Sequence, residues 1–351
     1  MIGWLRRHAM MLLGFAVSAA LIALVFRKVD WAEMGKAFLG ANYWVLLAGA
    51  AVGLCGFVIR ALDWRFLLAP VGRFAVRRLF PPVAIGYMAN NIFPARLGEL
   101  VRAYVVGKRE GVSKSAALAT IVIERIFDGL TLLLILAIVS IFFQFPPWVK
   151  RGGWIVAAVF FGLSVFLAVV SVNLSFGLRL VDATLGRWLP GAAGQMKSRL
   201  ECFVAGLDIT RHWREAALAF LVCMARWATE ACIYYSVVLA MGLPVPLYGV
   251  LFVMVVVNIA TMVPSAPAYV GAVQFGCFVA LSAIRGPGGA AVADQTTAAA
   301  YSVLLHAAIF FPITIAGIVC VFVSHIRFAA LRRPQERAAD GPMEASIPDV
   351  P

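Results

Sequence analysis

The segment 86–129 places charged side chains inside or beside stretches that are apolar enough to lie in a bilayer. A single ionised side chain at the centre of a membrane helix costs roughly 2.5 to 3.5 kcal/mol on insertion scales. These side chains must therefore pair with one another, line a water-filled cavity, or do both. The six residues are Arg96, Glu99, Arg102, Glu124, Arg125 and Asp128.

The composition of the whole chain is typical of a protein that lies in a lipid bilayer. Hydrophobic residues make up 63% of the 351 residues and charged residues only 13%, which predicts an all-α polytopic integral membrane protein. The net charge of +13 arises from basic residues in short loops between apolar runs. The positive-inside rule and anionic headgroups explain this placement better than nucleic-acid binding does, so no nucleic-acid partner is expected.

Two kinds of apolar segment are expected. Six are long enough to cross the membrane fully: 9–26, 43–68, 115–143, 154–172, 216–241 and 297–324. The regions 79–106 and 247–284 are instead interrupted near the middle by proline and small residues. We interpret each as a re-entrant hairpin of half-helices, and two full crossings would leave the topology of the rest unchanged.

The distribution of basic residues predicts the orientation. Eighteen Lys and Arg residues fall on the side of the N-terminus and six on the opposite side. Both termini are therefore expected on the cytoplasmic side of a bacterial inner membrane. The residues 1–330 form one membrane domain in this interpretation. Its cytoplasmic connection 175–215 is expected to be amphipathic, and the tail 334–351 to be disordered.

The regions 43–143 and 216–324 share a plan. Each has a charged span, then an interrupted hairpin, then a second span with ionisable side chains. Because the two regions begin in opposite directions across the membrane, they form an inverted repeat, which is typical of alternating-access carriers with a site between the repeats. The second-repeat candidates for the cavity are Arg226, Glu230, Asn258, Pro264, Pro267, Gly271 and His306.

Helical spacing indicates which charges of the first repeat can meet. Arg96, Glu99 and Arg102 follow one another at i,i+3, as do Arg125 and Asp128. Arginine is suited to bidentate phosphate binding, so we expect the three arginines to engage a lipid phosphate. The acids, including Glu124, would orient them or bind a cationic headgroup. The alternative is a set of internal ion pairs that only fixes helix packing.

Other polar residues have a structural interpretation beside a functional one. Arg60 and Asp63 are predicted to form a structural ion pair at i,i+3. Asn90 and Asn91, next to Pro94, line the cavity or cap the break. His306 is a hydrogen-bonded core residue or a proton relay. No metal site and no cofactor are expected, because the six cysteines have no metal-binding spacing.

The chain resembles a known family, and the resemblance is most specific in the first half. The run Asn91, Pro94, Arg96, Gly98, Glu99, Arg102, Glu124, Arg125 and Asp128 is similar to the membrane domain of lysylphosphatidylglycerol synthases and to stand-alone flippase-like proteins. The resemblance covers about residues 5 to 330. The second half departs from the family pattern, with Ala268 where glycine is common and Gln274 where an acid is common.

The resemblance implies a flippase domain that moves a polar or anionic lipid between leaflets. Without the aminoacyl-transfer domain of the synthases, the chain is not expected to make lysylphosphatidylglycerol. ATP hydrolysis is not expected either, because the sequence has no Walker motif. Two alternatives remain open: a membrane-embedded transferase acting on a lipid-linked phosphate, and a non-transporting partner of lipid-modifying enzymes, for example those of hopanoid or glycolipid pathways.

Overall fold

The computed structural model describes residues 2–93, 97–142, 147–181, 213–263, 265–286 and 289–324, with residues 183, 196, 200, 201 and 204 between them. These residues form helices and turns, and the only bridge among them joins Arg285 to Ala291. The predicted all-α class is therefore confirmed. Pro94, Arg96, Pro264, the tail 334–351 and most of the connection 175–215 lie outside the described residues.

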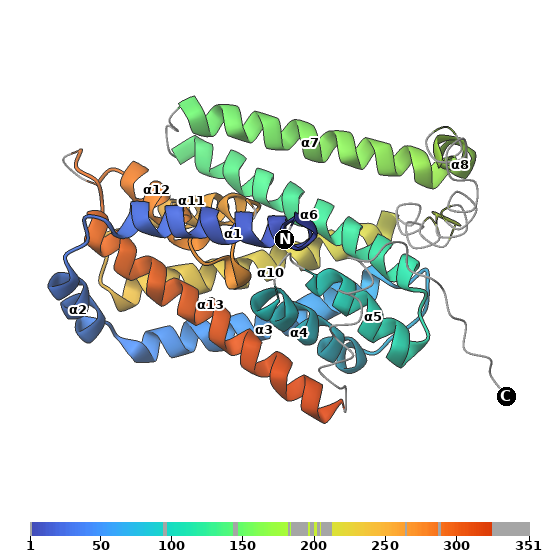
Figure 1. Cartoon of the computed structure of the whole chain (residues 1–351), viewed down its shortest axis with the longest axis horizontal. Coiled ribbons are helices and arrows are strands. Elements are labelled where there is room, and N and C mark those ends of the chain that lie inside the picture. The colour runs from blue at the N-terminus through green and yellow to red at the C-terminus, as the bar shows by residue number, and fades with distance from the viewer. Residues whose placement is uncertain are drawn as a thin grey trace.

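Figure 1 shows the helices and their labels. Their bounds are α1 (Ile2–Phe26), α2 (Trp31–Gly40), α3 (Tyr43–Leu67), α4 (Val76–Ile92), α5 (Gly98–Glu110), α6 (Lys114–Phe142), α7 (Pro147–Val172), α8 (Leu174–Val181), α10 (Trp213–Ala240), α11 (Leu247–Ala260), the short 3-10 helix η4 (Pro267–Tyr269), α12 (Ala272–Ala283) and α13 (Gln295–Val323).

Four of these helices are long and apolar enough to cross a membrane, namely α3, α6, α10 and α13. They correspond to four of the six expected full spans. A fifth candidate arises if α1 and α2, which meet at an angle of 88°, count as one broken span. Apolar helices of this length establish an integral membrane protein.

Small residues allow the central helix pair to pack closely. The glycines Gly49, Gly53 and Gly56 of α3 face α10, and a Cβ atom built on Gly56 would lie 2.5 Å from Thr229 Oγ1. Small residues at such intervals let helix backbones approach each other in a membrane. Helices α3 and α10 thereby form the centre of the bundle.

Both interrupted regions contain pairs of short helices. The four helices α4, α5, α11 and α12 have 12 to 17 residues, which corresponds to about 18 to 26 Å. Helix α4 packs on α5, and α11 packs on α12. Helix α4 also contacts η4, so the two interrupted regions meet inside the bundle.

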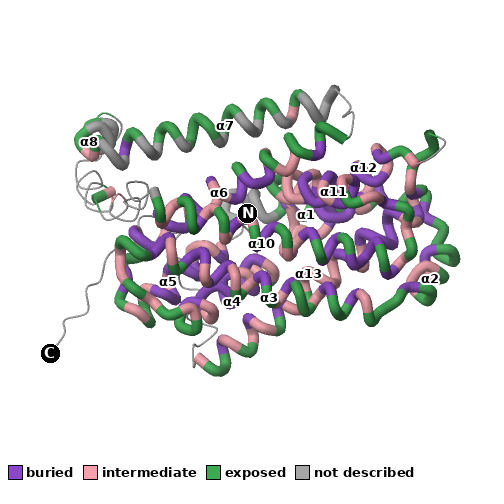
Figure 2. Tube along the Cα trace, turned by 180° about the vertical axis from the view of Figure 1, so that it is seen from behind, coloured by how far each residue is buried: buried purple, intermediate pink, exposed green. Residues whose placement is uncertain are grey.

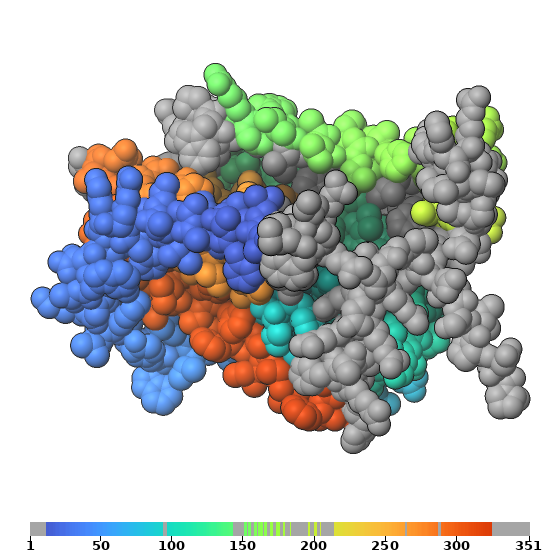
Figure 3. Space-filling model, in the orientation of Figure 1, coloured from blue at the N-terminus to red at the C-terminus, as the bar shows by residue number. Residues whose placement is uncertain are grey.

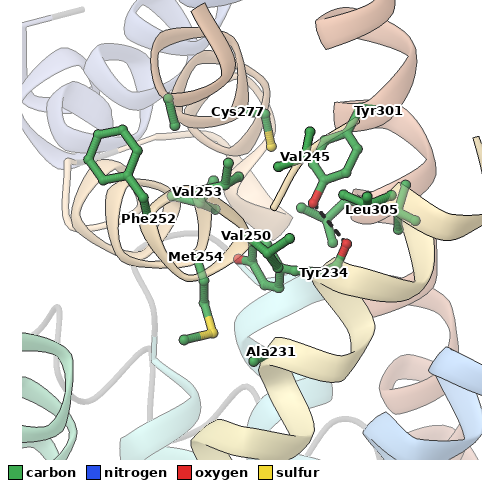
Figure 4. Packing of buried hydrophobic residues seen from close by; sticks show 14 of the residues in the cluster. Ala231, Tyr234, Val245, Val250, Phe252, Val253, Met254, Cys277, Tyr301 and Leu305 are labelled. Atoms are coloured by element: carbon green, nitrogen blue, oxygen red, sulfur yellow. Dashed lines mark hydrogen bonds between the residues drawn. The ribbon is translucent and has the colours of Figure 1, made fainter. Parts of the chain in front are cut away.

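The largest apolar core lies among α10, α11, α12 and α13. Figure 4 shows Tyr301 of α13 pointing toward Tyr234 of α10, whose carbonyl oxygen accepts a hydrogen bond of 3.0 Å from the Tyr301 hydroxyl. Cys277 lies in the same core, where it is fully buried. This core fixes the second half of the bundle around the polar site described below.

The outer helices leave apolar side chains exposed, as expected beside lipid. Helix α7 runs along one edge of the molecule next to α6, and its described residues are mostly exposed (Figure 2). Trp154 and Phe161 of α7 are 78% and 71% exposed. On the face seen in Figure 3, α1 and α13 lie beside each other below α7.

Candidate functional site

Glu124 of α6 is the centre of a buried ion network. Its carboxylate accepts hydrogen bonds from Arg60 of α3 at 2.7 Å and from Arg102 of α5 at 2.7 Å. The neighbouring Arg125 donates at 2.8 Å. Glu124 is fully buried, so the three guanidinium groups replace the solvation that its charge has lost.

Asp128, one turn further along α6, connects this network to the other half of the chain. It pairs with Arg226 of α10 and accepts a hydrogen bond of 3.1 Å from the indole nitrogen of Trp227. Arg125 lies 3.1 Å from its second oxygen, which confirms the i,i+3 pairing expected from the sequence. The network therefore joins α3, α5, α6 and α10.

The predicted ion pair between Arg60 and Asp63 is wrong. The Arg60 guanidinium extends to α6, where Glu124 lies at 2.7 Å and Asp128 at 3.8 Å. The two carboxylate oxygens of Asp63 are buried and have no hydrogen-bond partner among the described residues. Packing against a neighbouring helix thus gives Arg60 better acceptors than its own helix does.

The i,i+4 pair of Arg226 and Glu230 is present at 3.5 Å, but it is not a closed pair. Arg226 also binds Asp128, and Glu230 accepts a weak hydrogen bond of 3.4 Å from Asn258 of α11. Glu230 keeps 25% of its side chain exposed. It therefore connects the ion network to the second interrupted region.

Aromatic side chains that the sequence analysis did not single out surround the arginines. Tyr87 of α4 accepts a hydrogen bond of 2.8 Å from Arg125, and its ring lies 4.5 Å from the Arg60 guanidinium. Arg102 lies 3.7 Å from the Trp64 ring centroid. Such cation–π contacts stabilise desolvated guanidinium groups. The signal in the sequence is the position of Trp64 and Trp227 directly after charged residues.

The hairpin of α4 and α5 is held by two asparagines. The Asn90 side chain accepts a hydrogen bond of 2.7 Å from the Gly98 amide and donates one of 3.3 Å to Glu99. Asn91 donates at 2.8 Å to Thr314 of α13. Asn90 thus caps the start of α5, which is one of the two roles expected for it.

The second interrupted region has its own polar contacts. Gly271 has a φ of 86°, which favours glycine, and its amide donates a hydrogen bond of 2.8 Å to the side chain of Gln274. The side-chain amide of Gln274 lies 2.9 Å from Nδ1 of His306 and donates to it when this nitrogen is unprotonated. Gln274, for which the sequence predicts no role, thus links α12 to α13.

Side chains from both halves line one cavity of about 310 Å³. The structure thus places most candidates of the two repeats around the same cavity. The candidates that line it are Arg60, Asn90, Asn91, Glu99, Arg125 and Asp128 from the first half and Arg226, Glu230, Asn258 and His306 from the second. Arg102 does not line the cavity, and its guanidinium binds the buried carboxylate of Glu124.

Arg125 is the arginine of the network that is most accessible from the cavity. Its side chain is 40% exposed, against 8% for Arg60 and 3% for Arg226. The half-buried carboxylates of Glu99 and Glu230 also face the cavity. Among the described residues, the cavity thus offers one accessible guanidinium and two accessible acids, which complement a ligand with phosphate and ammonium groups. Within the described residues, no three His, Cys, Asp or Glu side chains are grouped to hold a metal ion.

Comparisons with known proteins agree with the resemblance seen in the sequence. A family model described as the lysylphosphatidylglycerol synthase TM region matches residues 11–317. The glycosyltransferase AglD of Haloferax volcanii is 26% identical over 333 residues, which cover 86% of this chain and 52% of AglD. A UPF0104 membrane protein of Methanothermobacter thermautotrophicus is 27% identical over 220 residues, which cover 56% of this chain and 63% of that protein.

The chain spans about half the length of AglD and less than two thirds of the second relative. A UPF0104 membrane protein of Methanocaldococcus jannaschii is 23% identical over 186 residues, or 53% of this chain and 75% of that protein. The family model, in contrast, extends over most of the chain and includes every helix of the ion network. The chain therefore belongs to the family of the lysylphosphatidylglycerol synthase membrane region.

Proposed function

We propose that this chain is a lipid flippase or transporter that moves a polar or anionic lipid between the leaflets of the bacterial inner membrane. The proposal includes cytoplasmic termini and no ATP hydrolysis by this chain. The observation that carries it is the cavity between the two halves, which the accessible guanidinium of Arg125 faces. A guanidinium in such a place can replace water as the partner of a phosphate during its passage.

The cavity wall is suited to an amphipathic ligand. Apolar side chains such as Phe57, Leu132 and Ile309 line the cavity together with the charged groups. A lipid whose headgroup contacts Arg125 could therefore keep its acyl chains beside apolar side chains. Free inorganic ions would gain nothing from this apolar part of the wall.

The arrangement of helices supports an inverted repeat with two re-entrant hairpins. In this proposal α3 to α6 form one unit and α10 to α13 the other, with α4/α5 and α11/α12 as the interrupted hairpins. Inverted repeats of carriers form an interface around their substrate. The contact of α4 with η4 and the cavity lined by both units are consistent with such an interface. Rocking of one unit against the other would then open the cavity to each leaflet in turn.

AglD is named a glycosyltransferase, which favours a transferase as the second candidate. In this alternative, the chain is a membrane-embedded transferase, and we propose a lipid-linked phosphate as its substrate. Glu99 and Glu230 are the carboxylates that could act as its base, because Glu124 and Asp128 are engaged by several arginines. A transferase would change the lipid chemically, whereas a flippase only changes its leaflet. Mass spectrometry of the lipids after incubation with labelled donors separates the two candidates.

Leaflet exchange in proteoliposomes tests the leading proposal. Purified protein is reconstituted with fluorescent anionic, zwitterionic or glycosylated lipids, and a membrane-impermeant quencher reports the fraction in the outer leaflet. We expect protein-dependent exchange of at least one anionic lipid without chemical change. A rate equal to that of protein-free vesicles for every lipid, with and without ion gradients, would reject the flippase.

A further inference from the structure

We propose that Asp63 is a proton-binding site that couples lipid movement to a proton gradient, an inference that rests on the proposed function. Asp63 lies on α3 behind the cavity and is fully buried. Neither of its carboxylate oxygens has a hydrogen-bond partner in the described part of the chain. Arg60, the cation expected to neutralise it, is bound to Glu124 instead.

Burial without hydrogen bonds costs far more for a charged carboxylate than for a neutral carboxylic acid. The two acids of the ion network differ from Asp63 in their partners, because Glu124 and Asp128 each bind more than one arginine. Both of those acids are held in their charged form by direct partners. Of these three acids, Asp63 is therefore the one that can gain or lose a proton without breaking an ion pair with a described residue.

The charges around Asp63 come from three helices. The groups that act on it electrostatically are Glu124 and Asp128 of α6, Arg226 of α10 and Arg60 of its own helix, and the Cys223 thiol of α10 also faces it. Three of them, Arg60, Asp128 and Arg226, line the cavity as well. These three side chains thus act on Asp63 and also line the proposed lipid path.

This position links the proton to the charge of the substrate. When the Asp63 carboxylate takes up one proton, it becomes a neutral acid and the net charge of the network rises by one. A more positive network binds the phosphate of an anionic headgroup more strongly. The proton and the anionic lipid would then enter together, and release of the proton on the other side would weaken the binding of the lipid.

Coupling is tested by imposing a pH gradient on proteoliposomes that contain fluorescent phosphatidylglycerol. One proton moved per lipid allows the leaflet ratio of the label to shift by up to about tenfold per pH unit toward the alkaline side. The matched variants are Asp63→Asn, which cannot bind the proton, and Asp30→Asn, an exposed change that keeps an N-cap side chain on α2. We expect the gradient response in the wild type and in Asp30→Asn but not in Asp63→Asn.

Infrared titration gives a readout that does not depend on transport. A protonated carboxylic acid has its own carbonyl stretching band, and we expect such a band in the wild type that is absent from Asp63→Asn. If Asp63→Asn does not fold, Asp63→Glu with isotopically labelled glutamate must move the band to the label. If the wild type shows the band but no lipid exchange, the flippase is rejected and the proton site is retained. If lipid exchange does not respond to the pH gradient, or if the band is absent, the coupling is overturned.

Discussion

Arg60 of α3 donates a hydrogen bond of 2.7 Å to Glu124 of α6, 64 positions away in the sequence, while Asp63 on its own helix has no hydrogen-bond partner among the described residues. Charged residues that helical spacing places in local pairs thus belong to one network that spans four helices. Glu124 is its centre, because guanidinium groups from α3, α5 and α6 all reach it. The consequences of removing single members can therefore be predicted.

We expect Glu124→Gln to destabilise the protein strongly. Removing one partner of a buried ion pair typically costs about 3–5 kcal/mol, because uncompensated charges remain buried. Here Arg60 and Arg102 would both lose the charge that compensates them, and one of the two would face an NH2 donor in place of its acceptor oxygen. Thermal unfolding in detergent measures the effect, with Glu33→Gln on the exposed surface of α2 as the control. Equal unfolding midpoints for the two variants would show that the network contributes little to stability.

Arg125→Ala is expected to slow leaflet exchange about tenfold or more, which corresponds to roughly 1.4 kcal/mol of lost stabilisation. Arg125→Lys should retain part of the rate, because a lysine keeps the charge but not the bidentate geometry. The matched control is Arg78→Ala, which removes a 62% exposed arginine from a surface ion pair with Glu110. A loss of rate in Arg78→Ala as large as in Arg125→Ala would contradict a specific role for Arg125.

Gly56→Ala should destabilise the contact between α3 and α10. Its Cβ atom would lie 2.5 Å from Thr229 Oγ1, and overpacking of this kind costs about 1–3 kcal/mol. Gly35→Ala in α2 is the control, since no atom lies within 4 Å of its new Cβ and the change should stabilise the helix by about 0.5–1 kcal/mol. Opposite shifts of the unfolding midpoint are predicted, and a stabilising effect of Gly56→Ala would contradict the close packing.

Two substitutions of Asn90 separate its two hydrogen bonds. Asn90→Ala loses the acceptor for the Gly98 amide, with an expected cost of about 0.5–2 kcal/mol, as for other helix caps. Asn90→Asp keeps this acceptor but places a carboxylate against Glu99 in place of the amide donor. We therefore expect Asn90→Asp to regain stability when Glu99 is also changed to Gln. If Glu99→Gln fails to improve Asn90→Asp, then Asn90 and Glu99 are not coupled.

The elements that sequence could predict are those set by local pattern. Apolar length gave the full spans that became α3, α6, α10 and α13, and proline with small residues marked both interrupted regions. The i,i+3 pair of Arg125 and Asp128 was likewise readable from helical spacing. Each of these features depends on residues within one continuous segment of the chain.

Contacts between helices could not be predicted from one sequence. The partner of Arg60 depends on how α3 packs against α6, and Tyr87 enters the site only because α4 lies beside both. Gln274 was set aside because it departs from the family pattern, yet a neutral amide is what can bind Gly271 and His306 at the same time. A carboxylate at this position has no hydrogen to donate, so it could not form the hydrogen bond that the unprotonated Nδ1 of His306 accepts.

Passage of a lipid through the cavity between the two halves can be tested by measuring the rate of leaflet exchange in a protein whose cavity is filled by a larger side chain. Ala308 of α13 lines the cavity, whereas Ala48 of α3 lies on the exposed outer side of the bundle. Reconstituted wild type, Ala308→Phe and Ala48→Phe are compared for exchange of fluorescent phosphatidylglycerol. We expect exchange in the wild type and in Ala48→Phe and a strongly reduced rate in Ala308→Phe. Equal rates in all three, or no exchange by the wild type, would contradict passage of a lipid through the cavity.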